Sequence, residues 1–198
     1  MATPKILVLP GSNRTGSYNV KLAALAAKEL TLLDADVTRI SLVDYPLPLY
    51  DADLEARSGV PANAIKLKQM IAAHHGVFIA CPEYCASVTP LLKNAIDWVA
   101  CVRERGDPAL AAFRNRVFAI ASATSEPAGG EHGLMALRQI LEIGCGALVV
   151  PEQVVVQNAD RAFDAMDNIS ETRVANLLRA QLARLVDMAR LIMRGGWR

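Results

Sequence analysis

Small polar residues gather between an apolar run and a helix-like pattern near the start of the chain. In "KILVLPGSNRTGSYNVKLA", residues 5–23, they directly follow the apolar stretch Ile6–Leu9. These residues are the hydroxyl-bearing Ser12, Thr15 and Ser17, the amides Asn13 and Asn19, and the guanidinium of Arg14. The amino end of a helix carries free N–H groups and a partial positive charge, and an arginine adds charged donors. The stretch favours a site for one phosphate group, although Ser17 or Asn19 could instead simply cap the helix.

The same stretch contains two glycines at the spacing of a nucleotide-triphosphate loop. Gly11 and Gly16 are separated by four residues, but Gly16 is followed by Ser17 and Tyr18, where that motif requires lysine and then serine or threonine. Without the lysine, the loop does not fit a triphosphate, and a single dianionic phosphate remains the better match.

The elements that would position this loop follow from hydrophobic patterning. Apolar runs rich in Val, Ile and Leu alternate with segments of helical period, which is typical of βαβ units. The expected strands are 6–9, 35–40, a strand starting at Gly76, 116–124 and 147–156, the last bent at Pro151. The expected helices are 20–33, 63–73, 90–102, 131–143 and 170–193, and residues 45–61 are expected to form a long loop. Strands without a polar face indicate a parallel sheet covered on both sides.

Five strands alternating with five helices predict an α/β fold, a doubly wound three-layer sandwich that forms a single domain over residues 1–198. Ligands of such sheets bind outside the carboxyl ends of the strands. Three loops are expected there, "PGSNRTGSYN", "CPEYCASVTP" and "SATSEPAGGEHG". All three are rich in small or hydroxyl-bearing residues, so we expect the chemistry to be at this edge.

Composition narrows the classes of partner and compartment. The 198 residues are 53% hydrophobic and carry a formal net charge of +1, which gives no reason to expect a nucleic acid or an anionic membrane as partner. No apolar run is long enough to span a bilayer, and no signal pattern is present at the start. The four cysteines, Cys81, Cys85, Cys101 and Cys145, are expected to be buried or half-buried free thiols with no metal-ligand spacing. We expect a cytoplasmic protein with a small-molecule partner.

A family resemblance adds to this interpretation. The stretch "PEYCASVTPLLKNAIDWV", residues 82–99, resembles the signature of the NADPH-dependent FMN reductase family, which includes chromate reductases, quinone reductases and azoreductases of the flavodoxin-like fold. The first loop is similar to the family's "GSxRxxSxNxxLA", and "GGEHGLMALRQIL" is similar to its double glycine at the exit of the fourth strand. The resemblance implies a five-stranded parallel sheet in the order 2-1-3-4-5.

The resemblance also implies a function and a set of site residues. It implies a non-covalent FMN and NADPH or NADH as co-substrate. In a ping-pong reaction, a hydride reaches flavin N5 and the electrons pass to a quinone, an azo dye, chromate or free flavin. The flavin carries the redox chemistry, so no side chain is expected to be catalytic. By this resemblance the phosphate would be bound by Ser12, Arg14, Ser17, Tyr18 and Asn19, the ring would be lined by Pro82, Glu83, Tyr84 and Cys85, and Ser122, Gly129 and Gly130 would form a third wall. A homodimer or homotetramer is implied as well.

Two departures from the family pattern keep alternatives open. Cys85 stands where the family usually has Asn, and a thiol cannot replace the hydrogen-bonding groups of an amide. Glu126 and Glu131 bring negative charge near the double glycine. Cys85 could be a reactive thiol beside the flavin, and the protein could be a flavodoxin-like electron carrier or a regulatory module without turnover. His132 is expected at the surface and Trp98 in the core or at a subunit contact.

Overall fold

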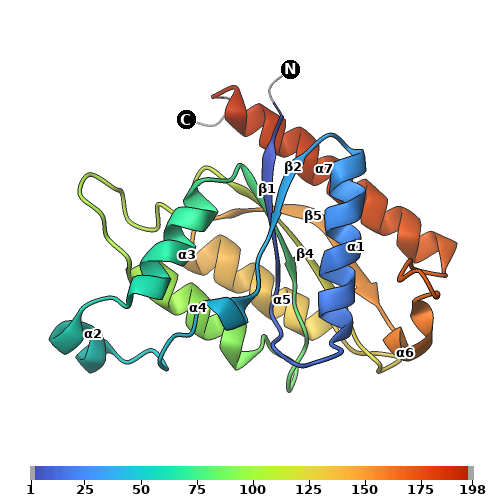
Figure 1. Ribbon diagram of the computed structural model, residues 1–198, viewed down its shortest axis with the longest axis horizontal. Helices are drawn as coiled ribbons and strands as arrows, with labels where there is room; N and C mark the ends of the chain where they lie inside the picture. Colours follow the sequence, from blue (N-terminus) through green and yellow to red (C-terminus); the bar gives the residue numbers. More distant parts are fainter. Residues whose placement is uncertain (1–2, 196–198) are drawn as a thin grey trace.

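A twisted parallel sheet runs through the centre of the computed structural model, which describes residues 3–195 (Figure 1). Its strands are β1 (Lys5–Pro10), β2 (Asp36–Arg39), β3 (Gly76–Ala80), β4 (Val117–Ala123) and β5 (Leu148–Val156). They lie in the order β2-β1-β3-β4-β5, and each neighbouring pair is parallel. The predicted fold class and strand order are therefore confirmed.

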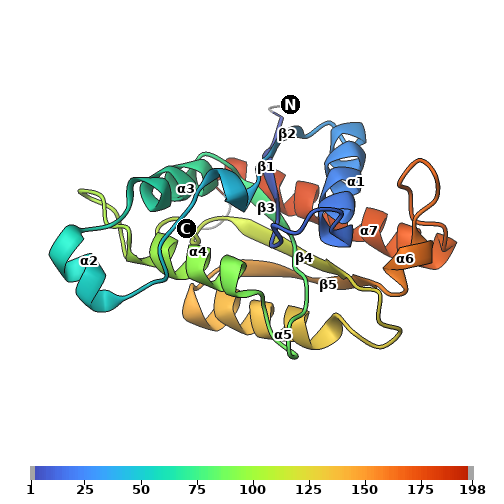
Figure 2. The same ribbon diagram turned by 60° about the horizontal axis from the view of Figure 1, so that its bottom comes forward.

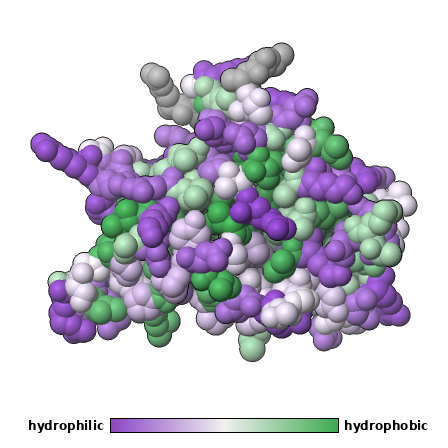
Figure 3. Space-filling view, in the orientation of Figure 1, coloured by the Kyte–Doolittle hydropathy of each residue, from purple (hydrophilic) through white to green (hydrophobic). Residues whose placement is uncertain are grey.

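Helices cover both faces of this sheet, as the patterning predicted (Figures 1 and 2). The helices α1 (Tyr18–Leu32) and α7 (Thr172–Met193) pack on one face. On the other face lie α3 (Ala62–Ala72), α4 (Pro90–Cys101) and α5 (Glu131–Gln139). Within residues 3–195, no helix combines the length and the hydrophobicity that crossing a membrane requires. Hydrophilic and hydrophobic residues are interspersed over the face shown in Figure 3.

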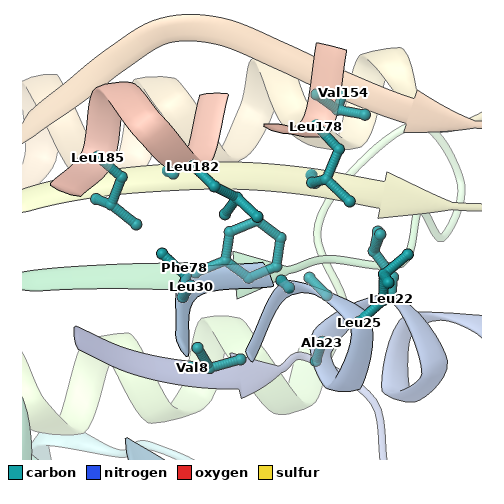
Figure 4. Packing of buried hydrophobic residues seen from close by; sticks show 14 of the residues in the cluster. Val8, Leu22, Ala23, Leu25, Leu30, Phe78, Val154, Leu178, Leu182 and Leu185 are labelled. Atoms are coloured by element: carbon teal, nitrogen blue, oxygen red, sulfur yellow. The ribbon is translucent and has the colours of Figure 1, made fainter. Parts of the chain in front are cut away.

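The core under α1 and α7 is centred on Phe78 of β3. Its ring is fully buried and lies among leucines that include Leu30 and Leu182 (Figure 4). Burying each such side chain stabilises the fold by about 1.5–3 kcal/mol. Trp98, as expected, is fully buried, in a separate small cluster with Ala64 and Val102.

The long loop predicted for residues 45–61 is wrong in part, because it contains the helix α2 (Ala52–Ser58). The Asp51 side chain caps α2 by accepting from the Asp53 amide at 2.9 Å. None of the residues of α2 is buried, so its sequence lacks the apolar stripe that hydrophobic patterning detects. Two short turns of helix were also missed, namely η1 (Leu42–Asp44) and α6 (Ala159–Ala162). The helix predicted over residues 131–143 is present, and its last turn is the π-helical η2 (Ile140–Gly144) that continues α5.

Two side chains of α4 hold the segment that precedes α2. Asn94 and Trp98 both donate to the Pro48 carbonyl, at 2.9 and 2.8 Å, and the Asn94 carbonyl oxygen accepts from the Tyr50 amide at 2.8 Å. The ring of Tyr50 meets Trp98 edge-on, with centroids 5.0 Å apart. These bonds explain why an amide and an indole occur four residues apart on α4.

The edge strand β5 bends at Pro151, as predicted. The register between β4 and β5 shifts there. Phe118 pairs with Val149 and Ile120 pairs with Gln153, so a step of two residues along β4 corresponds to a step of four residues along β5. The two additional residues in β5 keep its alternation of faces but interrupt the hydrogen-bond ladder. The fully buried Gln181 of α7 reaches this point, and its Nε2 donates to the carbonyls of Ile120 and Glu152 at 2.9 and 2.8 Å.

A buried lysine ties the loop after α4 to α3. Lys68 has a side chain only 4% exposed and forms ion pairs with Glu104 and Asp107. Burial lowers the pKa of Lys68, but hydrogen bonds with Asp107 and Glu104 outweigh burial, and the net pKa lies above 10.5. Hydrogen bonds from Lys68 and Gln69 lower the pKa of Glu104 below its ordinary value of 4.5.

This ion pair predicts a loss of stability in acid. A carboxyl group whose pKa is lower in the folded state stabilises that state above its unfolded pKa, and the contribution disappears as pH falls through the folded value. We therefore expect the melting temperature of the wild type to fall more steeply below about pH 4.5 than that of Glu104→Gln. Thermal melts of both proteins between neutral pH and pH 3 test this. Parallel curves would show that the bond to Lys68 contributes nothing, and Glu126→Gln, at an exposed carboxylate, is the control.

Candidate cofactor site

Three loops meet at the carboxyl edge of the sheet, which Figure 2 brings forward. They are residues 11–17 between β1 and α1, residues 81–89 between β3 and α4, and residues 124–130 between β4 and α5. Because parallel strands end at the same edge, these loops lie together although they are far apart in sequence. They are the three loops that the sequence singled out.

Cross-loop hydrogen bonds fix the loops relative to one another. Thr89, the N-cap of α4, donates through Oγ1 to the Gly11 carbonyl at 2.7 Å. The buried amide of Asn19 makes two bonds to the backbone of Ala123, donating to its carbonyl at 2.7 Å and accepting from its N–H at 3.0 Å. These contacts join the first loop to α4 and α1 to the end of β4, so the edge is pre-organised.

The amino end of α1 has the features of an anion site. Its N-cap, Ser17, makes no side-chain capping bond, and within residues 3–195 no group accepts from the backbone N–H groups of Gly16, Tyr18 or Asn19. Arg14 lies over the Tyr18 ring, 5.8 Å from its centroid, and makes no ion pair within the described chain. Free amides, a free hydroxyl and an unpaired guanidinium together suit a phosphate.

Two of the expected phosphate ligands also have structural roles. The Ser12 hydroxyl accepts from the Arg14 amide at 3.2 Å, which shapes the loop. Asn19 uses its carbonyl oxygen and one N–H on Ala123, so a single N–H remains for another acceptor. Sequence reasoning missed this positioning role, because Ala123 lies 104 residues further along the chain.

A tight turn occupies the tip of the second loop. The backbones of Tyr84 and Ser87 exchange two hydrogen bonds, at 2.9 and 3.0 Å, and between them Cys85 and Ala86 have φ of 48° and 58°. Positive φ at both central residues defines a type I′ turn, which favours Asn followed by Gly. Cys85 is exposed, so the expectation that all four thiols are buried or half-buried is wrong here. Cys85 stands where the family usually has Asn, and Asn adopts this backbone conformation more readily than Cys. The difference at residue 85 therefore affects the conformation of the turn.

The positive φ of Cys85 and Ala86 leads to a prediction about the stability of the protein. Cys85→Asn and Ala86→Gly should each stabilise the protein by about 0.5–1 kcal/mol, because a left-handed backbone disfavours residues with a β-carbon other than Asn or Asp. Urea denaturation measures the change. Ala109→Gly, at an exposed loop residue that does not itself have a positive φ, is the control and should be neutral or destabilising. A loss of stability in the two turn variants would contradict the proposed strain.

The third loop supplies a buried polar wall. Ser122 is fully buried, and its Oγ has no hydrogen-bond partner within the described residues. Gly130 has φ of 98°, and a Cβ added there would lie 2.7 Å from Val155 Cγ1 and 3.1 Å from Ser122 Oγ. The site therefore requires glycine at 130. An unsatisfied hydroxyl beside a backbone free of side chains fits a planar polar ligand, so these residues fit the edge of a flavin ring.

The buried thiol and the histidine near this edge have structural explanations. Burial raises the pKa of the Cys81 thiol, directly after β3, to about 12, so this thiol remains protonated at neutral pH. His132 is at the surface as expected, with its side chain 64% exposed. Within residues 3–195 no three His, Cys, Asp or Glu side chains are placed to hold a metal ion.

The sheet order, the two helical layers and this edge define a flavodoxin-like αβα protein with a ligand site at the carboxyl ends of its strands. The model of the NADPH-dependent FMN reductase family matches residues 4–161, and the chain belongs to that family. The protein is therefore an oxidoreductase of a family that uses FMN and NAD(P)H.

Individual relatives agree with this assignment. An NAD(P)H-dependent FMN reductase of Pseudomonas aeruginosa is 32% identical over 183 residues, which cover 91% of this chain and 92% of the relative. A quinone reductase of Escherichia coli is 35% identical over 141 residues, 69% of each chain. Among solved structures, the flavoenzyme NAD(P)H:(acceptor) oxidoreductase FerB of Paracoccus denitrificans superposes with a TM-score of 0.76 at 25% identity, covering 95% of this chain and 98% of FerB.

Proposed function

We propose that this protein binds FMN non-covalently at the carboxyl edge of the sheet and transfers electrons from NADPH or NADH to a small acceptor by a ping-pong mechanism. The observation that carries the proposal is the open amino end of α1, where unpaired amides and the unpaired Arg14 offer a phosphate site at the edge where the second and third loops also lie. Membership of the family supports the proposed electron transfer through FMN, and the geometry of the site supports binding of FMN at this edge of the sheet.

The roles of the chain's own residues follow from their positions. Arg14, Ser17 and the first amides of α1 bind the phosphate, and Ser12 and Asn19 hold that loop in shape. Bound FMN would accept a hydride from the nicotinamide nucleotide and pass two electrons to the acceptor. Around it, residues 82–85 line one side of the ring, and Ser122, Gly129 and Gly130 line another. No side chain here is assigned a proton-transfer step.

Quinones are the acceptors that we propose first, because relatives at 35% identity are named quinone reductases. Azo dyes, chromate and free flavin are further proposed acceptors, since electron transfer from a flavin requires only approach to the ring and no shaped nucleophile. Turnover assays with each acceptor, at saturating NADPH and then NADH, would rank both the acceptors and the two nucleotides.

The absorption spectrum of the purified protein tests the proposal directly. After incubation with excess FMN and desalting, we expect retained flavin bands that bleach when NADPH or NADH is added without oxygen and return with a quinone. If desalting removes the flavin, a fluorescence titration with FMN decides whether it binds. Absence of binding in the titration would overturn the proposal. Binding without bleaching would overturn the enzyme and favour the electron carrier or the regulatory module.

We propose further that the protein is a cytoplasmic homodimer or homotetramer. Four free thiols fit a reducing compartment, and the segment before α2, held against α4 by Asn94 and Trp98, exposes Val43 and Leu49, whose relative exposures are 56% and 80%. A monomer mass in light scattering would contradict the oligomer.

A further inference from the structure

Glu83, expected to line the ring, directs its carboxylate into the amino end of α5. Its side chain is 15% exposed, and Oε2 accepts from the backbone N–H of Gly133 at 2.8 Å. Gly133 is the third residue of α5, so its N–H has no partner within the helix. A carboxylate at this position makes a charge-assisted hydrogen bond and also interacts favourably with the helix dipole.

The backbones of the two elements approach closely at the same point. A Cβ added to Gly133 would lie 3.0 Å from the Glu83 Cβ and 3.2 Å from the Glu83 Cα. Glycine therefore favours this contact, because a side chain at residue 133 would crowd the backbone of Glu83 by a few tenths of an ångström. The other carboxylate oxygen, Oε1, lies 3.9 Å from Nδ1 of the exposed His132.

The segment that Glu83 anchors is the strained one. Directly after Glu83 and Tyr84, the chain enters the turn in which Cys85 and Ala86 both adopt left-handed conformations. On the other side of the contact, α5 begins immediately after Gly129 and Gly130. The hydrogen bond between Glu83 and Gly133 thus connects the two loops that would flank the flavin ring. It also holds in place a turn whose backbone conformation is strained.

We propose that Glu83 is a positioning residue that sets the width of the ring site by fastening the 84–87 turn to the amino end of α5. This inference rests on the proposed binding of FMN at this edge. With the fastening in place, the second and third loops are ordered before the cofactor arrives, so binding does not have to order them. Without it, we expect the turn to move independently of the Gly129–Gly130 loop and FMN affinity to fall.

Two substitutions at one position separate the hydrogen bond from the charge. Glu83→Gln keeps a carbonyl oxygen that can accept from Gly133, whereas Glu83→Ala removes the acceptor. Asp53→Ala removes a carboxylate from the first turn of α2 and is the matched control, because Asp53 is exposed, makes no side-chain bond within the described residues and lies outside the three loops. The readouts are the FMN dissociation constant from fluorescence titration and the exchange rate of the Gly133 amide in FMN-free protein by NMR.

We expect Glu83→Ala to weaken FMN binding about 10-fold and to speed exchange of the Gly133 amide, with Glu83→Gln within about 3-fold of the wild type on both measures. Rescue by glutamine would assign the effect to the bond. If Glu83→Ala binds FMN with wild-type affinity, the inference is overturned and the proposed function remains intact. The same conclusion follows if Glu83→Gln binds FMN as weakly as Glu83→Ala. If the wild type itself fails to bind FMN, the proposed function fails and the role of Glu83 in the ring site falls with it.

Discussion

Replacement of Arg14 by alanine is expected to weaken FMN binding by about 1.5–3 kcal/mol, or roughly 10- to 150-fold, because a hydrogen bond to a charged partner contributes about that much. Arg14 is exposed, makes no ion pair within the described chain, and lies over the ring of Tyr18 beside unpaired amides. Its guanidinium is therefore free to bind a phosphate. Fluorescence titration of FMN with wild type and variant measures the difference.

Controls distinguish a phosphate contact from a general effect of charge. Arg105→Ala removes an exposed arginine from the loop between α4 and β4, at the opposite edge of the sheet, and should leave the dissociation constant unchanged. Arg14→Lys keeps the charge but loses the planar fork, so its affinity should lie between those of wild type and Arg14→Ala. The affinity of Arg14→Ala should also depend less on salt. An unchanged dissociation constant for Arg14→Ala would exclude the phosphate role.

Much of the fold could be predicted because its elements alternate between two kinds of periodicity. The strands β1, β3 and β4 are buried at nearly every residue, which appears in the sequence as continuous apolar runs. The helix α1 shows its buried face through Leu22, Leu25 and Leu30. A helix that buries nothing, such as α2, leaves no such pattern, and hydrophobic patterning failed there for that reason.

The sequence allowed us to predict which loops form the site. It did not allow us to predict which residues of those loops contact one another. Glycine, hydroxyl and proline content marked the three carboxyl-edge loops, because turns and close backbone approach require those residues. The bonds that fix the loops join residues distant in sequence, since Glu83 and Gly133 are 50 residues apart and Asn19 and Ala123 are 104 apart. Local patterns contain no information about such pairs. The left-handed backbone at Cys85 was missed because a thiol gives no signal for it.

Replacement of Gln181 by leucine is expected to destabilise the fold by about 2–4 kcal/mol. The Gln181 amide is fully buried and donates to the carbonyls of Ile120 and Glu152, where the irregularity at Pro151 separates β4 from β5. Leucine preserves much of the volume but takes away the donor for the buried Ile120 carbonyl and the partly buried Glu152 carbonyl. On the other face, Arg138 donates to the Val150 carbonyl at 2.7 Å and would remain in place.

Urea denaturation of the two proteins gives the free energy of unfolding, and Gln139→Leu, at an exposed glutamine at the end of α5, is the matched control. The control should change stability by less than about 0.5 kcal/mol. If Gln181→Leu also changes the free energy of unfolding by less than about 0.5 kcal/mol, the carbonyls of Ile120 and Glu152 must have found other hydrogen-bond donors. Because Gln181 lies between α7 and the sheet, away from the three loops, protein that remains folded should bind FMN with wild-type affinity. Stability and cofactor affinity would then respond to different residues, Gln181 for the first and Arg14 for the second.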